Sequence, residues 1–208
     1  MKRILFFSSL LVLLTSALNA QISKGSILLG GSIGFNKNKV EDTDKESNSV
    51  SVMPAIGVAI KQNLVAGISL TYNGSKNTYN TPNSETKNDS YGASFFMRKY
   101  MTLGKGFFLF GEGNLYYQTS KNVYSYSGSE NVQKSWGTGI YIYPGLSYAV
   151  SKRFHLETGL PQLANFGFSK TKSISNGATT EKDKGVSFNV SAGSLSTISL
   201  GFRFFFAK

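Results

Sequence analysis

Cysteine is absent from the 208-residue sequence, and histidine occurs only once. Without cysteine the chain forms no disulfide, binds no metal through thiolates and carries no lipid on an N-terminal cysteine. No group of side chains has the spacing of metal ligands. The glycine-rich segment 29–34 has no helix after it that would complete a phosphate-binding loop. We therefore expect no cofactor and no metal.

Long apolar runs are also absent after residue 20. Before it, two basic residues precede an apolar stretch at 4–14 and a short polar stretch that ends in Ala20. This order is typical of a secretory signal peptide. We predict a signal peptide over 1–20, cleaved between Ala20 and Gln21, and one mature domain over 21–208. An uncleaved membrane anchor is the alternative, although the apolar stretch is shorter than the ~20 residues that a spanning helix needs.

What the mature sequence does contain is a period of two in eight segments. One face of each segment is apolar, and the other is built from Gly, Ser, Ala and Asn with few charges. Such alternation fits a soluble sandwich with its apolar face inside, or a membrane barrel with its apolar face outside. The segments cover about 26–36, 49–60, 63–74, 90–101, 106–118, 135–150, 153–169 and 185–206.

Two details favour the barrel. Small side chains on the polar face suit the narrow lumen of an eight-stranded barrel, which its own side chains fill. The segments also run for about 10–14 residues, whereas a spanning strand needs ~9–11 and a typical soluble strand has ~5–6. We therefore predict an all-β, eight-stranded antiparallel transmembrane up-and-down β-barrel. Aromatic residues near both ends of the segments would form its two interfacial girdles.

The connections between these segments alternate in length. Three are short, at 61–63, 102–105 and 151–153, and four are long and polar. Short periplasmic turns that alternate with long external loops are typical of outer-membrane barrels. The long loops are candidates for contact with an extracellular partner, and they cover 37–48, 75–89, 119–134 and 170–184.

Acidic residues are scarce, so the formal net charge is +11, or +9 without the two basic residues of the signal peptide. A basic chain often binds nucleic acid, but export argues against that partner here. Basic residues instead gather at the short turns, where they either face anionic phospholipid headgroups or are simply solvated. They are Lys24, Lys61, Lys99, Lys105, Lys152, Arg153 and Lys208.

Three prolines interrupt the predicted strands: Pro54, Pro144 and Pro161. A closed barrel has no edge strand, so each proline removes a hydrogen-bond donor from the ladder. We expect bulges or weakened pairing there, most strongly at 160–163, where the apolar phase is also broken.

Four charged residues share the inward phase near the short turns: Arg98, Glu112, Glu157 and Arg203. Because an unpaired buried ion costs several kcal/mol, we predict the interior pairs Arg98–Glu112 and Glu157–Arg203 on neighbouring strands. These pairs either stabilise the structure or form a constriction that controls ion passage.

His155, the only histidine, lies two residues before Glu157 on the same face. The two could form a catalytic base and its orienting carboxylate, but no serine nearby stands out as a nucleophile. We interpret His155 as structural and expect no enzymatic activity.

Three stretches, 95–112, 143–148 and 200–206, resemble the small outer-membrane β-barrel proteins of Gram-negative bacteria, which include the barrels of outer-membrane proteins A and X and the porin-family type. The alternating Phe202, Phe204 and Phe206 are similar to the C-terminal signal read by the barrel assembly machinery, although two residues follow them here. The resemblance implies a barrel in the cell outer membrane, in contact with its lipids, but no shared activity.

Three functions stay open at this point. The first is a non-enzymatic outer-membrane barrel that stabilises the envelope or interacts at the surface through its loops. The second is a narrow pore or a conduit for hydrophobic small molecules. The third is a soluble, exported β-sandwich that binds a ligand.

Overall fold

The structure is a computed structural model, and it describes residues 22–40, 45–80, 83–126, 129–175, 178–190 and 199–206. The predicted signal peptide and its cleavage site at Ala20 and Gln21 lie outside these residues. Among the described residues, no helix is long and apolar enough to cross a membrane.

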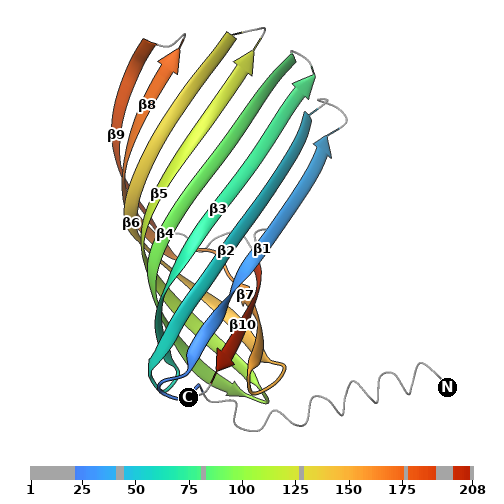
Figure 1. The fold of residues 1–208 in the computed structure, drawn as a ribbon, viewed down its shortest axis with the longest axis vertical. Helices are drawn as coiled ribbons and strands as arrows, with labels where there is room; N and C mark the ends of the chain where they lie inside the picture. Colours follow the sequence, from blue (N-terminus) through green and yellow to red (C-terminus); the bar gives the residue numbers. More distant parts are fainter. Residues whose placement is uncertain are drawn as a thin grey trace, which may run out of the picture.

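All regular structure in the described residues is β-strand, and every pairing between strands is antiparallel (Figure 1). The strands are β1 (Ile27–Val40), β2 (Lys45–Lys61), β3 (Leu64–Asn80), β4 (Asn83–Gly104), β5 (Phe107–Tyr126), β6 (Ser129–Ala149), β7 (Phe154–Gly159), β8 (Ala164–Ser175), β9 (Ala178–Val190) and β10 (Ser199–Phe206).

Eight of these strands close into a ring in the order β1-β2-β3-β4-β5-β6-β7-β10. The ring closes where the first residues of β1 pair with the last strand, from Ile27 opposite Phe206 to Ser32 opposite Gly201. This ring lies at the end of the molecule that carries the short turns, which we call the turn end (Figure 1). The predicted eight-stranded antiparallel ring is confirmed.

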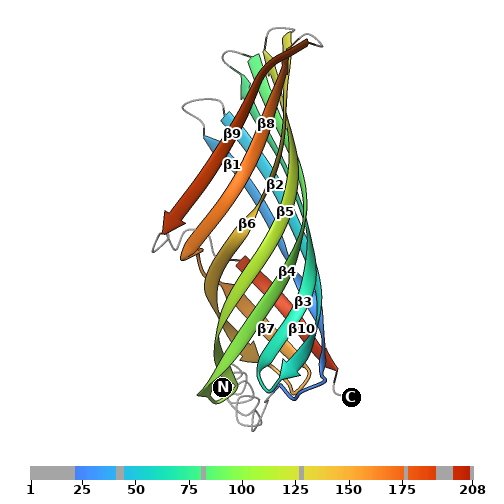
Figure 2. The same ribbon diagram turned by 90° about the vertical axis from the view of Figure 1, so that its left-hand side faces the viewer.

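Beyond the ring, the wall is an open curved sheet (Figure 2). The predicted strand 153–169 is divided into β7 and β8, and the predicted strand 185–206 into β9 and β10. β6 changes partner along its length, from β7 over 145–149 to β8 over 131–142. Among the described residues, β9 pairs only with β8, and residues 33–40 of β1 pair only with β2.

The prolines explain part of this division. Pro161 lies in the gap between β7 and β8, at the break expected for 160–163. Pro144 lies on β6 at the level where its partner changes, and its carbonyl accepts a hydrogen bond from the Leu160 amide (2.9 Å). Pro54 keeps its place opposite Gly31, but the β2–β3 ladder is interrupted beside it. Pro54 and Pro144 therefore lie where pairing with one neighbouring strand is interrupted, and Pro161 lies between two strands, since proline has no amide donor to offer.

The predicted long loops are wrong as loops. In their described residues, segments 37–48, 75–89, 119–134 and 170–184 continue the strands as four antiparallel pairs, which we call the arms. Their polar composition suggested loops, but a hairpin with two solvated faces needs no apolar face. Continued pairing satisfies the backbone donors and acceptors that a loop would leave to water.

The two faces of the wall separate as the alternation predicts. The apolar face points outward and is exposed: Phe35 is 76% exposed and Ile140 is 54% exposed. The face of small and polar residues points into the ring, where Ser147 and Val65 are buried. A soluble sandwich would bury the apolar face, so this arrangement overturns the sandwich alternative.

Candidate functional site

The interior of the ring is packed with side chains near the turn end. Its core contains five aromatic residues that are at most 4% exposed, and the tyrosine among them contacts three of the others at centroid distances of 5.8 to 6.2 Å. These aromatic residues are Phe96, Tyr100, Phe108, Phe110 and Phe205. The ring therefore surrounds a filled core, as expected for a barrel of eight strands.

The four inward charges meet within this core. Arg98 on β4 and Glu112 on β5 are direct cross-strand partners, and Arg98 Nε lies 2.5 Å from Glu112 Oε2. Arg203 on β10 lies beside Glu157 on β7, with 3.4 Å between Arg203 Nε and Glu157 Oε2. The structure thus brings together the members of each predicted pair.

A third contact joins the two pairs into one network. Arg98 Nη1 donates a hydrogen bond across the lumen to Glu157 Oε2. The order of contacts is therefore Glu112–Arg98–Glu157–Arg203, with two positive and two negative charges. We call these four residues the ion network.

Sequence reasoning missed the polar residues that complete the network. Tyr100 Oη donates to Glu157 Oε1 (2.7 Å), and Tyr143 Oη donates to Glu112 Oε1 (2.8 Å). Asn114 Nδ2 donates to the same Glu112 oxygen (2.9 Å). The alternation of the sequence places all three residues on the inward face. It does not indicate which strands face each other across the lumen, so it could not identify these contacts.

The network also fastens the seam where the ring closes. Arg203 Nη1 donates to the Gly31 carbonyl on β1 (2.9 Å). The guanidinium group of Arg98 lies over the Phe110 ring, 4.2 Å from its centroid. Each ion is thus compensated by opposite charge, by hydrogen bonds or by an aromatic face. That compensation is what makes buried charge tolerable.

His155 lies beside the network and is 1% exposed. Its Nδ1 is 3.1 Å from the Ser147 hydroxyl, while Nε2 has no hydrogen-bond partner among the described residues. Its ring stacks on Phe108 and meets Phe205 edge-on. Glu157 lies on the same face, but its carboxylate is bound by the two arginines and Tyr100. The serine and histidine are both enclosed, so the arrangement offers a substrate no access to them.

The remaining predicted residues lie on the surface. Phe202, Phe204 and Phe206 share the outer face of β10 and are 38 to 47% exposed. The described residues of the basic turn set are all exposed at the turn end, and Lys208 lies outside the described residues. No group of three or more possible metal ligands occurs in the part of the chain that the structure describes.

No protein-family model and no curated protein matches the chain. Solved structures do match. A major outer membrane protein from Thermus thermophilus has 9% identity and a TM-score of 0.49, covering 88% of this chain and 99% of that one. Neisserial surface protein A has 15% identity and a TM-score of 0.38, with coverages of 86% and 96%. The translocator domain of the autotransporter NalP from Neisseria meningitidis has 12% identity and a TM-score of 0.40, with coverages of 98% and 94%.

The first of these structures is an outer-membrane protein by name.

Proposed function

We propose that the chain is an integral outer-membrane β-barrel without enzymatic activity, closed to solutes at its turn end, whose arms interact at the cell surface. The observation that carries this proposal is the outward apolar face. It runs around all eight strands of the ring, and each of these strands carries exposed apolar side chains on it. In water such a face would drive aggregation, whereas in a bilayer it is the surface that contacts lipid.

The height of the apolar face supports a location in a membrane. Aromatic pairs lie outside the wall at the turn end, where the Phe107 and Tyr148 rings are 4.7 Å apart, and farther up, where Tyr117 and Trp136 are 6.2 Å apart. From Phe107 to Tyr117, the strand climbs about 33 Å at about 3.3 Å per residue, or about 25 Å along the axis at a tilt of about 40°. That is the height of the apolar band in outer-membrane barrels.

The filled ring argues against the alternative of an open pore. Arg98 spans the lumen between β5 and β7 through its contacts with both carboxylates, and aromatic side chains fill the space around it. A solute would have to break the ion network to pass. We therefore assign the network a structural role in preference to gating.

The arms support a role at the surface. Beyond Tyr72, β3 continues to Asn80, which is about 26 Å of strand at about 3.3 Å per residue. Both faces of the arms are polar over most of this length. Such ribbons present backbone and side chains to an extracellular partner without contributing to the barrel core.

This function is tested by membrane fractionation together with gel mobility before and after heating. We expect the protein in the outer-membrane fraction, after removal of a signal peptide, and a faster band before heating, because a folded barrel resists detergent. A soluble periplasmic product would contradict the proposal.

Conductance tests the closed ring. Refolded protein in a planar bilayer should give no single-channel steps, because the ion network and the aromatic core fill the lumen. Steps from the native protein that are lost or altered in Arg98→Ala would favour the narrow-pore alternative.

A further inference from the structure

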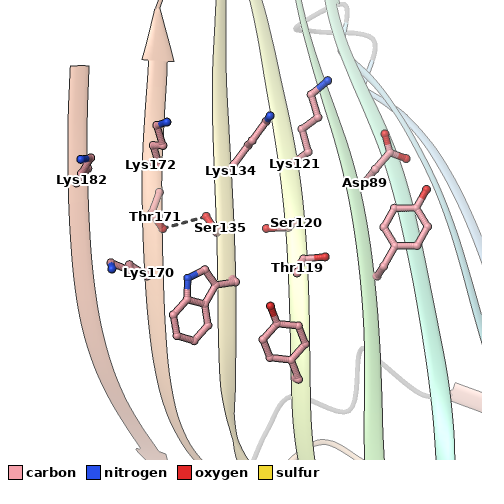
Figure 3. Close-up of a pocket in the computed structure, with 13 residues that line it drawn as sticks. Asp89, Thr119, Ser120, Lys121, Lys134, Ser135, Lys170, Thr171, Lys172 and Lys182 are labelled. Carbon is pink, nitrogen blue, oxygen red and sulfur yellow. Dashed lines mark hydrogen bonds between the residues drawn. The ribbon is translucent and has the colours of Figure 1, made fainter. Parts of the chain in front are cut away.

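Four lysines form a row across the outer face of the arms, just above the aromatic residues. Cross-strand register places Lys121 on β5 opposite Lys134 on β6, Lys134 opposite Lys172 on β8, and Lys172 opposite Lys182 on β9. Figure 3 shows the four side by side on neighbouring strands. We call them the lysine row. Since adjacent strands lie about 4.8 Å apart, the row spans about 14 Å.

Like charges directly opposite each other destabilise a sheet, so an isolated row of this kind is unfavourable. Among the described residues, no carboxylate forms an ion pair with any of the four lysines. Asp89, the neighbour of Lys121 in register, instead accepts a hydrogen bond from the Tyr72 hydroxyl (3.1 Å).

On the adjoining strands β1–β4, three lysines of the arms form ion pairs within the chain. Lys37 on β1 lies 3.2 Å from Glu46 on β2. Glu85 on β4 accepts from both Lys76 (2.6 Å) and Lys87 (2.7 Å). Carboxylates thus compensate Lys37, Lys76 and Lys87. The lysine row on β5–β9 has no such partner in the described parts of the chain, so an anion from outside would relieve its repulsion.

The lysine row borders a groove of about 560 Å³ whose lower wall is aromatic. Trp136 stacks on Tyr117 at 6.2 Å and meets Phe168 at 5.6 Å. A further lysine, Lys170, lies opposite Trp136 in register and also lines the groove. The groove therefore places amphipathic aromatic rings directly below a cluster of ammonium groups.

We propose that this groove binds the phosphate groups of lipid headgroups in the outer leaflet, with the acyl chains lying down the apolar face below Trp136. Tryptophan and tyrosine rings favour the headgroup level of a bilayer, so the lysines beside them lie where headgroup phosphates lie. The ammonium group of lysine binds phosphate as a point charge. Because the cationic groove continues directly into the apolar face, it fits a ligand that has both a phosphate group and an acyl chain. The inference rests on the proposed membrane location.

The chain carries its own reporter for this test, because Trp136 is the only tryptophan and lines the groove. The protein is refolded into phosphatidylcholine vesicles that contain a small fraction of lipid brominated on its acyl chains. The brominated lipid is either phosphatidylcholine or phosphatidic acid, whose headgroup is a phosphate monoester. Quenching of Trp136 fluorescence then measures which lipid is enriched at the groove. We expect an enrichment of phosphatidic acid of at least about fivefold, the effect of one lysine near a charged surface.

Matched variants distinguish a specific site in the groove from a general attraction of anionic lipid to the basic chain. The first variant replaces the lysine row, with Lys121→Gln, Lys134→Gln, Lys172→Gln and Lys182→Gln. The control removes the same charge from β1, β3 and β4, with Lys37→Gln, Lys39→Gln, Lys76→Gln and Lys87→Gln. We expect the first variant to lose the preference for phosphatidic acid and the control to keep it.

Each of the other outcomes would contradict one part of the proposal. Equal quenching by both lipids in the native protein, or an equal loss of preference in both variants, contradicts the phosphate site but leaves the membrane location intact. A complete absence of quenching by either lipid contradicts the membrane location itself. If brominated phosphatidic acid is not enriched, while inorganic phosphate shifts the Trp136 fluorescence and chloride at matched ionic strength does not, the groove is a site for free anions, and the lipid assignment fails.

Discussion

The ring at the turn end and the arms beyond it are built from the same strands, yet they hold their charges in opposite ways. In the ring, every strand has two partners, and four ionisable side chains meet in one buried network. In the arms, charged residues such as Lys87 and Lys121 lie exposed on the outer face, and β9 lacks a second partner among the described residues. The difference indicates that the ring carries the stability of the fold, whereas the arms carry its surface chemistry.

The largest expected difference between the two regions is in amide hydrogen exchange. Residues 27–32 of β1 pair with strands on both sides, whereas residues 33–40 pair only with β2 in the described structure. Alternate amides of 33–40 should therefore exchange through local opening that costs little. Those of 27–32 should require global unfolding, a difference of about 5 kcal/mol or more.

Exchange measured by mass spectrometry on peptides from β1 checks this expectation. Residues 45–61 of β2 provide the internal control, because β2 has partners on both sides over most of its length. Equal protection along all of β1 would mean that a further strand covers its upper edge in solution.

The next largest effect should follow from breaking the ion network. Glu157→Ala removes the carboxylate that both Arg98 and Arg203 contact and leaves two guanidinium groups buried without it. Breaking a buried pair by removing one partner costs about 3–5 kcal/mol. Urea titration of the refolded barrel, followed by Trp136 fluorescence, measures the loss.

The control for this variant lies in the arms. Glu46→Ala removes an exposed partner of Lys37, and surface pairs contribute little, so its unfolding midpoint should match the native one. Equal effects of the two variants would remove the distinction between ring and arms.

A third prediction concerns packing inside the ring. A Cβ atom at Gly145 on β6 would overlap the Phe110 ring and lie 2.5 Å from the Thr158 carbonyl oxygen. At Gly111, in the same region of the ring, it would meet nothing within 4 Å. Gly145→Ala should therefore destabilise the barrel by about 1–3 kcal/mol, as overpacking does, and Gly111→Ala should not.

Urea titrations of the two glycine variants under identical conditions provide the comparison. If Gly145→Ala unfolds at the native midpoint, the core near Phe110 is looser than its contacts indicate.

Much of the ring could be predicted from the sequence because its signals are local. Alternation assigned Ile140 to the outer face and Val65 to the inner face without knowledge of any partner strand. Pro161 marked the break between β7 and β8 for an equally local reason, the missing amide. The inward phase also placed Arg98 and Glu112 on the inner faces of neighbouring strands, where the structure brings them together.

The features that could not be predicted from the sequence depend on contacts between strands that are distant in the chain. The hydrogen bond from Arg98 to Glu157 joins β4 and β7, which are not neighbours in the ring, so it depends on the width of the lumen. The arms were mistaken for loops because Ser, Asn and Lys are poor strand formers alone, and only their pairing with an equally polar partner makes them strands. The same holds for the lysine row, which appears only when β5, β6, β8 and β9 are in register.

The smallest expected effect is the pH dependence of an ion pair in the arms. Hydrogen bonds from Lys76 and then Lys87 hold the pKa of Glu85 below its ordinary value of 4.5. Because the folded pKa is lowered, the stabilisation is fully present above pH 4.5 and is lost as the pH falls through the folded pKa. Glu85 is solvated, so the effect on stability should be slight.

An NMR titration of the Glu85 carboxyl carbon in the native protein and in Lys76→Gln measures this shift. The variant should move the pKa of Glu85 toward 4.5, since it removes the larger of the two lysine contributions. The unfolding midpoint at neutral pH should remain close to native. If the pKa were unchanged, Lys76 and Lys87 would be no better compensated than the lysine row. The contrast between the two groups of lysines, on which the assignment of the groove depends, would then be lost.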